Sequence, residues 1–135
     1  MKDTPGVSLQ VTVSDLSITE AFYAGILELP VRRALTMRGA PEHLYLEQDG
    51  YELIFVDEDA VAKAHPLLGE RSSMFPKGVG ITFHFRVNDL EGIYEALLDE
   101  EMEILYPLED KPYGMKELWC FDPDGYLLVL EEPTR

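Results

Sequence analysis

Residues Asp49–Phe55 read DGYELIF and residues Asp124–Leu130 read DGYLLVL, so the chain contains nearly the same stretch twice. In both, an Asp-Gly pair stands before a strand-like run, and glycine accepts the positive φ that a tight turn between two strands requires. Recurrence of a turn and a strand at two distant places indicates a duplicated structural unit. The two stretches therefore predict equivalent strands of a repeated module.

A second pair of similar stretches lies upstream of the first, LQVTVSDL from Leu9 and FHFRVNDL from Phe83. Apolar and polar residues alternate in both, which is typical of a strand with one buried face. Apolar residues at helical spacing follow each Asp-Leu: Ile18, Phe22 and Ile26 in the first half, and Ile93, Ala96 and Leu97 in the second. Each strand is therefore expected to lead into an amphipathic helix.

Three strand-like segments follow each predicted helix. They lie around 31–37, 43–48 and 51–56 in the first half, and around 103–108, 116–121 and 126–131 in the second. The unit is βαβββ, and we predict one α+β domain of two tandem modules, about 5–58 and 78–133, joined by a connector at about 59–77. If the helices cover the apolar faces, the polar faces of two curved sheets can line a half-barrel cleft.

Composition and charge restrict the class of protein. The 135 residues suffice for about one domain, and 46% of them are apolar, which is enough for a folded core. We expect a cytoplasmic protein without a membrane partner, because no apolar run approaches about 18 residues and the first residues lack the apolar core of a signal peptide. The net charge of −15 repels phosphate backbones, so we expect no nucleic-acid partner, and a cationic or neutral small ligand is easier to admit.

Cys120 is the only cysteine, which excludes an intrachain disulfide and a multi-thiolate metal site. Its place in the run LWCF predicts a small buried hydrophobic residue.

Three longer segments carry a family resemblance: VSDLSITEAFYAGILELPV (13–31), VNDLEGIYEALLDEEMEI (87–104) and KPYGMKELWCFDPDGYLLVLEEP (111–133). Together they resemble the vicinal-oxygen-chelate superfamily, which has the fold of glyoxalases, bleomycin-resistance proteins and extradiol dioxygenases. The resemblance covers nearly the whole chain. It implies paired βαβββ modules, often with two chains in one functional unit, so we expect a homodimer.

The resemblance also implies four cleft-facing positions at which the enzymes of the family bind a divalent metal through His, Gln or Glu. Here those positions hold Ser8, Ile54, Thr82 and Val129. Aliphatic side chains have no lone pair to donate, and neutral hydroxyls are poor ligands for a transition metal. We therefore expect no metal, no cofactor and no metal-dependent catalysis at this site.

A shift of two residues along each strand keeps the same face and gives Gln10, Glu52, His84 and Leu127. The first three could bind a metal weakly. Alternatively, Glu52 orients His84 in a hydrogen-bonding row, or the two form an ordinary structural pair. These alternatives rest on antiparallel pairing of the first and last strands of each module.

Alternation places Glu117 and Trp119 on one face of their strand and Leu118 and Cys120 on the other. The resemblance implies ligand contact for Trp119, whose ring suits a planar group or a cation, and closure of the pocket by Tyr113. Core filling by Trp119 and surface packing of Tyr113 are the alternatives.

The predicted ligand-binding residues are Gln10, Glu52, Ile54, Thr82, His84, Tyr113, Glu117, Trp119 and Val129. A mainly apolar pocket with a few polar groups suits an organic molecule. We predict a non-metallic small-molecule-binding protein that sequesters a cationic or aromatic compound, with no catalytic residue assigned. The alternatives are a metal-dependent lyase, isomerase or dioxygenase that uses Gln10, Glu52 and His84, and metal-free acid/base catalysis by Glu52 or His84.

Overall fold

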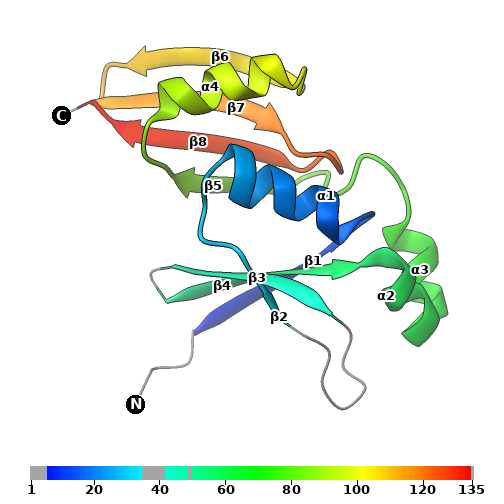
Figure 1. The fold of residues 1–135 in the computed structure, drawn as a ribbon. Helices are drawn as coiled ribbons and strands as arrows, with labels where there is room; N and C mark the ends of the chain where they lie inside the picture. The colour runs from blue at the N-terminus through cyan, green and yellow to red at the C-terminus, as the bar shows by residue number, and fades with distance from the viewer. Residues whose placement is uncertain (1–5, 35–41, 49, 135) are drawn as a thin grey trace.

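Two four-stranded sheets and the helices that pack on them form the structure, a computed structural model that describes residues 6–34, 42–48 and 50–134 (Figure 1). Each sheet comes from one half of the chain, and each half has the order strand, helix, three strands. The predicted α+β fold of two tandem βαβββ modules is therefore confirmed.

The first sheet has the strand order β1-β4-β3-β2. Its elements are β1 (Val7–Val13), α1 (Leu16–Glu20), the π-helical stretch η1 (Ala21–Ile26), β2 (Arg32–Ala34), β3 (His43–Gln48) and β4 (Tyr51–Asp57). Gly50 has a φ of 84° in the turn between β3 and β4, as the Asp-Gly pair predicts. Asp49 and residues 35–37 of the expected strand lie outside the described residues.

The second sheet repeats this arrangement in the order β5-β8-β7-β6. Its elements are β5 (Thr82–Arg86), α4 (Leu90–Asp99), β6 (Ile104–Lys111), β7 (Met115–Phe121) and β8 (Leu127–Pro133). Gly125, at the equivalent turn, has a φ of 91°, and a Cβ there would lie 2.7 Å from that of Pro76. Both the backbone conformation and the close approach therefore require glycine at this turn.

Two helices that the sequence analysis did not predict lie between the modules, α2 (Glu58–Ala64) and α3 (Pro66–Ser72). The Asp57 carboxylate caps α2 by accepting from the backbone N–H groups of Asp59 and Ala60. Pro66 begins α3, where its missing N–H costs no hydrogen bond. No helix in the described ranges is long and apolar enough to cross a membrane.

The antiparallel pairing expected within each module is wrong. β1 runs parallel to β4, which makes Ser8 the neighbour of Glu52 and Gln10 the neighbour of Ile54. β5 is likewise parallel to β8. The helix after the first strand brings the chain back to the end of the sheet where that strand began, so the next strand, at the opposite edge, runs in the same direction. Two antiparallel reversals then give the last strand that direction as well.

The first helix also differs from its predicted apolar stripe. Ile18 is 54% exposed, whereas Phe22 and the adjacent Tyr23 are both buried. The helix changes from α to π geometry after Glu20, and its i to i+5 hydrogen bonds rotate the later side chains relative to a 3.6-residue repeat.

One hydrophobic core joins the two modules. The ring of Tyr23 lies 4.7 Å from that of Phe55 in the first sheet and 6.0 Å from that of Phe85 in the second. Its hydroxyl donates a 2.7 Å hydrogen bond to Asp122, whose other carboxylate oxygen accepts from the backbone N–H groups of Asp124 and Tyr126. The helix of the first module is thus bonded to the last turn of the second.

Burial raises the pKa of Asp122 from 3.8 to about 6, although the hydrogen bond from Tyr23 opposes this shift. The folded chain then binds more protons than the unfolded chain between these values, so the contribution of Asp122 to the free energy of unfolding falls as pH rises through that window. In Asp122→Asn an amide replaces the carboxylate and no proton is exchanged.

The quantity to measure is the difference in free energy of unfolding between the wild type and Asp122→Asn. We expect this difference to decrease by roughly 3 kcal/mol as pH rises from 3.8 to about 6, since one pKa unit corresponds to about 1.4 kcal/mol. Urea denaturation at a series of pH values measures it. The control is Asp99→Asn, which removes an exposed carboxylate at the end of α4. A difference that stays constant or increases would contradict the effect assigned to burial.

Candidate functional site

Each sheet has an inner face on the shared core and an outer face. In β7, Leu118 and Cys120 are fully buried in the core, as alternation predicts. Glu117 and Trp119 therefore belong to the outer face. The same alternation places the other predicted strand residues of the site on the outer faces of the two sheets.

On the first sheet, the outer face carries Ser8, Gln10, Glu52 and Ile54. Ser8 and Gln10 are exposed, whereas Glu52 and Ile54 are half-buried. The Ser8 hydroxyl donates a 2.8 Å hydrogen bond to the Glu52 carboxylate. Glu52 is therefore bonded within its own sheet.

On the second sheet, strand register aligns one residue from each strand in two neighbouring rows. The first row consists of His84, Val129, Trp119 and Tyr106, and the second consists of Arg86, Glu131, Glu117 and Glu109. Val129 lies in the middle of its row and is 1% exposed. An aromatic and aliphatic row thus lies beside a row rich in carboxylates.

Thr82 and His84 lie on β5, at one edge of this sheet, and both are exposed. The Nδ1 atom of His84 is 3.9 Å from the Glu131 carboxylate, and the His84 side chain is 58% exposed. An ion pair that is so exposed to water contributes little free energy, so this contact does not hold the His84 side chain in place.

Glu117 is 9% exposed and receives two side-chain hydrogen bonds. One comes from the hydroxyl of Tyr113 in the β6–β7 turn, and the other comes from Nε1 of Trp119 at 3.3 Å. The bond from Tyr113 lowers the pKa of Glu117 below its ordinary value of 4.5, against the opposing effect of burial. Glu117 is therefore ionised at neutral pH.

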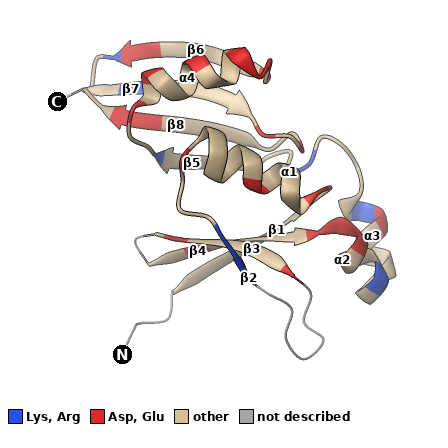
Figure 2. Ribbon diagram, in the orientation of Figure 1, with Lys and Arg blue, Asp and Glu red and all other residues tan. Residues whose placement is uncertain are grey.

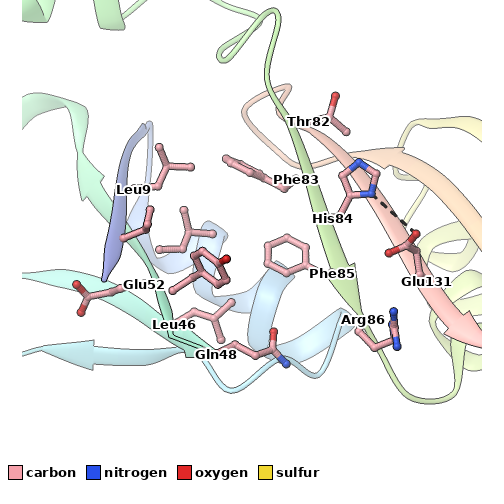
Figure 3. Close-up of a pocket in the computed structure, with 13 residues that line it drawn as sticks. Leu9, Leu46, Gln48, Glu52, Thr82, Phe83, His84, Phe85, Arg86 and Glu131 are labelled. Atoms are coloured by element: carbon pink, nitrogen blue, oxygen red, sulfur yellow. Dashed lines mark ion pairs between the residues drawn. The ribbon is translucent and has the colours of Figure 1, made fainter. Parts of the chain in front are cut away.

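A cavity of about 550 Å³ between the modules brings apolar side chains together (Figure 3). Leu9, Phe83 and Phe85 lie between Glu52 and His84, which point away from each other on its two sides. Gln10 shares the outer face of Glu52. One copy of the chain therefore does not bring Gln10, Glu52 and His84 together.

The positions that the resemblance implies for metal ligands are likewise divided between the sheets, with Ser8 and Ile54 on one and Thr82 and Val129 on the other. Two hydroxyls and two aliphatic chains do not fit a divalent transition metal. Within the described residues, no three His, Cys, Asp or Glu side chains could jointly hold a metal ion.

A second cavity, of about 520 Å³, lies on the outer face of the β6–β7 hairpin and contains Tyr113, Glu117 and Trp119. Tyr106 also lines it, with its ring edge to face against Trp119 at 5.2 Å. The remaining lining residues are Pro107, Glu109 and Lys111. Sequence analysis missed Tyr106 and Glu109, although they lie in or next to a predicted strand, because no face was assigned to that strand.

Residues 7–130 match the model of a family described as the Glyoxalase/Bleomycin resistance protein/Dioxygenase superfamily. A search of curated protein sequences found no match.

Several solved structures are similar in fold. A glyoxalase-related enzyme from Fulvimarina pelagi has a TM-score of 0.64 at 17% identity, over 93% of this chain and 86% of that one. TioX from Micromonospora sp. ML1 has a TM-score of 0.59 at 17% identity, over 93% of both chains. A lactoylglutathione lyase from Agrobacterium tumefaciens has a TM-score of 0.58 at 18% identity, over 93% and 91%. At these identities the likeness shows the fold alone.

Removal of the Tyr113 hydroxyl is expected to raise the pKa of Glu117, because the hydrogen bond from Tyr113 is the largest effect that lowers it. Carbon-13 NMR titration of the glutamate carboxyl groups in Tyr113→Phe measures this change. Tyr51→Phe is a matched control, since Tyr51 is 62% exposed and Tyr113 is 63% exposed, but Tyr51 lies on the first sheet. Equal titration of Glu117 in both variants would show that Tyr113 does not stabilise the carboxylate.

Proposed function

Because the chain belongs to the glyoxalase/bleomycin resistance protein/dioxygenase superfamily, as its sequence resemblance predicted, we propose that it binds a small organic molecule without a bound metal ion. The observation that carries this proposal is the donor set at the implied ligand positions. Ser8 and Thr82 offer hydroxyls, and the strands beside them offer Ile54 and Val129. This set lacks the imidazole and carboxylate groups that bind divalent transition metals.

The outer face of the second sheet supports a binding role. Trp119 provides apolar surface, and Glu117, Thr82 and His84 provide a few polar groups around it. Val129, between them in the sheet, is buried and offers no free surface in one copy of the chain. The cavity of about 520 Å³ on this face falls within the range typical of sites for small ligands. These features suit recognition by shape, stacking and hydrogen bonds.

The protein is proposed to act as a homodimer, because the two outer faces of one copy lie on opposite sides of its core. A second copy can place the outer face of its first sheet across from the outer face of the second sheet in its partner. β1 and β5 are edge strands of their sheets, and exposed edges are open to pairing. Val7, Leu9 and Ile81 are 55%, 41% and 43% exposed beside these edges, which leaves apolar surface for a partner to cover.

Chelator-treated protein titrated with Ni²⁺, Zn²⁺, Fe²⁺ and Mn²⁺ in a calorimeter should give no saturable heat, since the implied ligand positions lack donors. The proposal fails if near-stoichiometric binding appears. Loss of that binding in His84→Ala or Glu52→Ala, with Glu95→Ala as an exposed control on α4, would favour the metal-dependent lyase, isomerase or dioxygenase instead.

Sedimentation velocity tests the homodimer. We expect the wild type to sediment as a dimer and Val7→Glu to shift toward the monomer, because a carboxylate in a buried apolar contact must lose its water. Leu98→Glu is the matched control, since Leu98 is 52% exposed on α4, away from both edges. The proposed homodimer, with a cleft between the outer faces of two copies, would be contradicted by a wild type that is monomeric at every concentration. Equal sedimentation of the two variants would contradict it as well.

A further inference from the structure

The cavity on the β6–β7 hairpin has the form of a partly open aromatic box. Tyr106, Tyr113 and Trp119 all line it, and the Tyr106 and Trp119 rings meet at an interplanar angle of 75°. Tyr106 and Tyr113 are 53% and 63% exposed, so much of their surface remains free for a ligand. Aromatic faces attract cations through the ring quadrupole, and boxes of this kind recognise quaternary ammonium groups.

A fixed negative charge lies at the base of this box. Glu117 is nine-tenths buried, and its two carboxylate oxygens each accept one hydrogen bond, from Tyr113 and from Trp119. A carboxylate offers about four acceptor sites, so these bonds orient Glu117 without using all of them. The two donors also connect the charge directly to two of the three aromatic rings.

Neighbouring charges leave the cavity negative. Among the described residues, Lys111 is the only cation that lines it, and Lys111 forms a 2.7 Å ion pair with Glu109 from the same strand. Glu131 is the cross-strand neighbour of Glu117, and Arg86 completes that row with one positive charge beside the three carboxylates. Figure 2 shows acidic segments at the ends of β6 and β8, on either side of β7. A cation near Glu117 therefore meets an excess of negative charge, which favours its approach.

The arrangement favours an organic cation over two other occupants. A metal ion needs several donor atoms at short range, and the described residues provide no such cluster. An uncharged aromatic compound could stack on the rings but would add no positive charge beside Glu117, where the nearby Lys111 is itself paired with Glu109. An alkylammonium group spreads its charge over several carbon atoms, which suits contact with rings on its sides and a carboxylate beneath it.

We propose that this cavity binds an organic ammonium group, which Tyr106, Tyr113 and Trp119 surround and whose charge Glu117 balances. The inference rests on the proposed small-molecule function and assigns a ligand class and a location to it. Glu117 acts here as a counter-ion and Tyr113 as a positioning residue that holds the carboxylate.

Choline and its uncharged isostere 3,3-dimethyl-1-butanol test the proposal on the full-length protein. Trp119 is the only tryptophan in the chain, so its fluorescence reports directly on this cavity. We expect choline to change the emission saturably and to bind at least about tenfold more tightly than the isostere, a difference of about 1.4 kcal/mol. Calorimetry gives an independent value of both affinities.

Glu117→Gln keeps an acceptor for Tyr113 and removes the charge. It should weaken choline binding by about tenfold, roughly the energy of one charge-assisted contact, and weaken binding of the isostere by much less. Glu95→Gln makes the same change of net charge at an exposed position of α4, on the opposite side of the second sheet, and should leave both affinities unchanged.

Equal binding of choline and the isostere to the wild type would overturn the inference, and this comparison requires no variant to fold. Absence of choline binding, or equal choline affinity of Glu117→Gln and Glu95→Gln, would overturn it as well. A thermal-shift screen of uncharged aromatic compounds separates this failure from a failure of the proposed function. Hits in that screen without choline binding would leave the small-molecule function standing and reject only the ammonium group.

Discussion

The contact between Tyr23 and Asp122 determines how the two modules are arranged. Burial raises the pKa of the Tyr23 hydroxyl well above its ordinary value of 10.0, and Asp122 reinforces that shift. The phenol therefore stays protonated and donates to Asp122 while its ring packs between Phe55 and Phe85. This contact lies within a core that both sheets share, so the polar faces of both sheets point outward. The candidate site is divided into two halves because the outer faces of the two sheets lie on opposite sides of this core.

Duplication supplied both halves, but they have diverged at equivalent positions. Tyr45 pairs with Ile54 in the first sheet as Trp119 pairs with Val129 in the second. By the same register, His43 occupies the place that Glu117 has in the second module, and its ring lies 6.3 Å from that of Tyr45. A ring is retained in both modules, whereas the buried carboxylate occurs only in the second. The two modules share one backbone arrangement, but only the second has the buried carboxylate at this position, so an ammonium group would bind to the second module and not to the first.

Sequence patterns predicted the architecture because the Asp-Gly turns and the alternating strands are local features. They missed the strand direction since alternation of faces is the same in parallel and antiparallel pairs. At the site, alternation placed Glu117 and Trp119 correctly on the face away from the core. It could not have placed Tyr106 and Glu109 together, because β6 shifts register between them and residues three apart come to line one cavity. Irregularities of this kind arise from tertiary packing and leave no periodic signal.

The state of Glu117 distinguishes binding from acid/base chemistry on the second sheet. A general base works best when its pKa lies near the working pH, yet the hydrogen bonds to Glu117 move its pKa in the opposite direction. His84, the other titratable candidate on this face, is mostly exposed and lies 3.9 Å from Glu131, so nothing in that contact fixes its orientation for proton transfer. A carboxylate that is held in place and kept ionised between aromatic rings is suited to balance a positive charge, and this is the physical reason to favour recognition over catalysis.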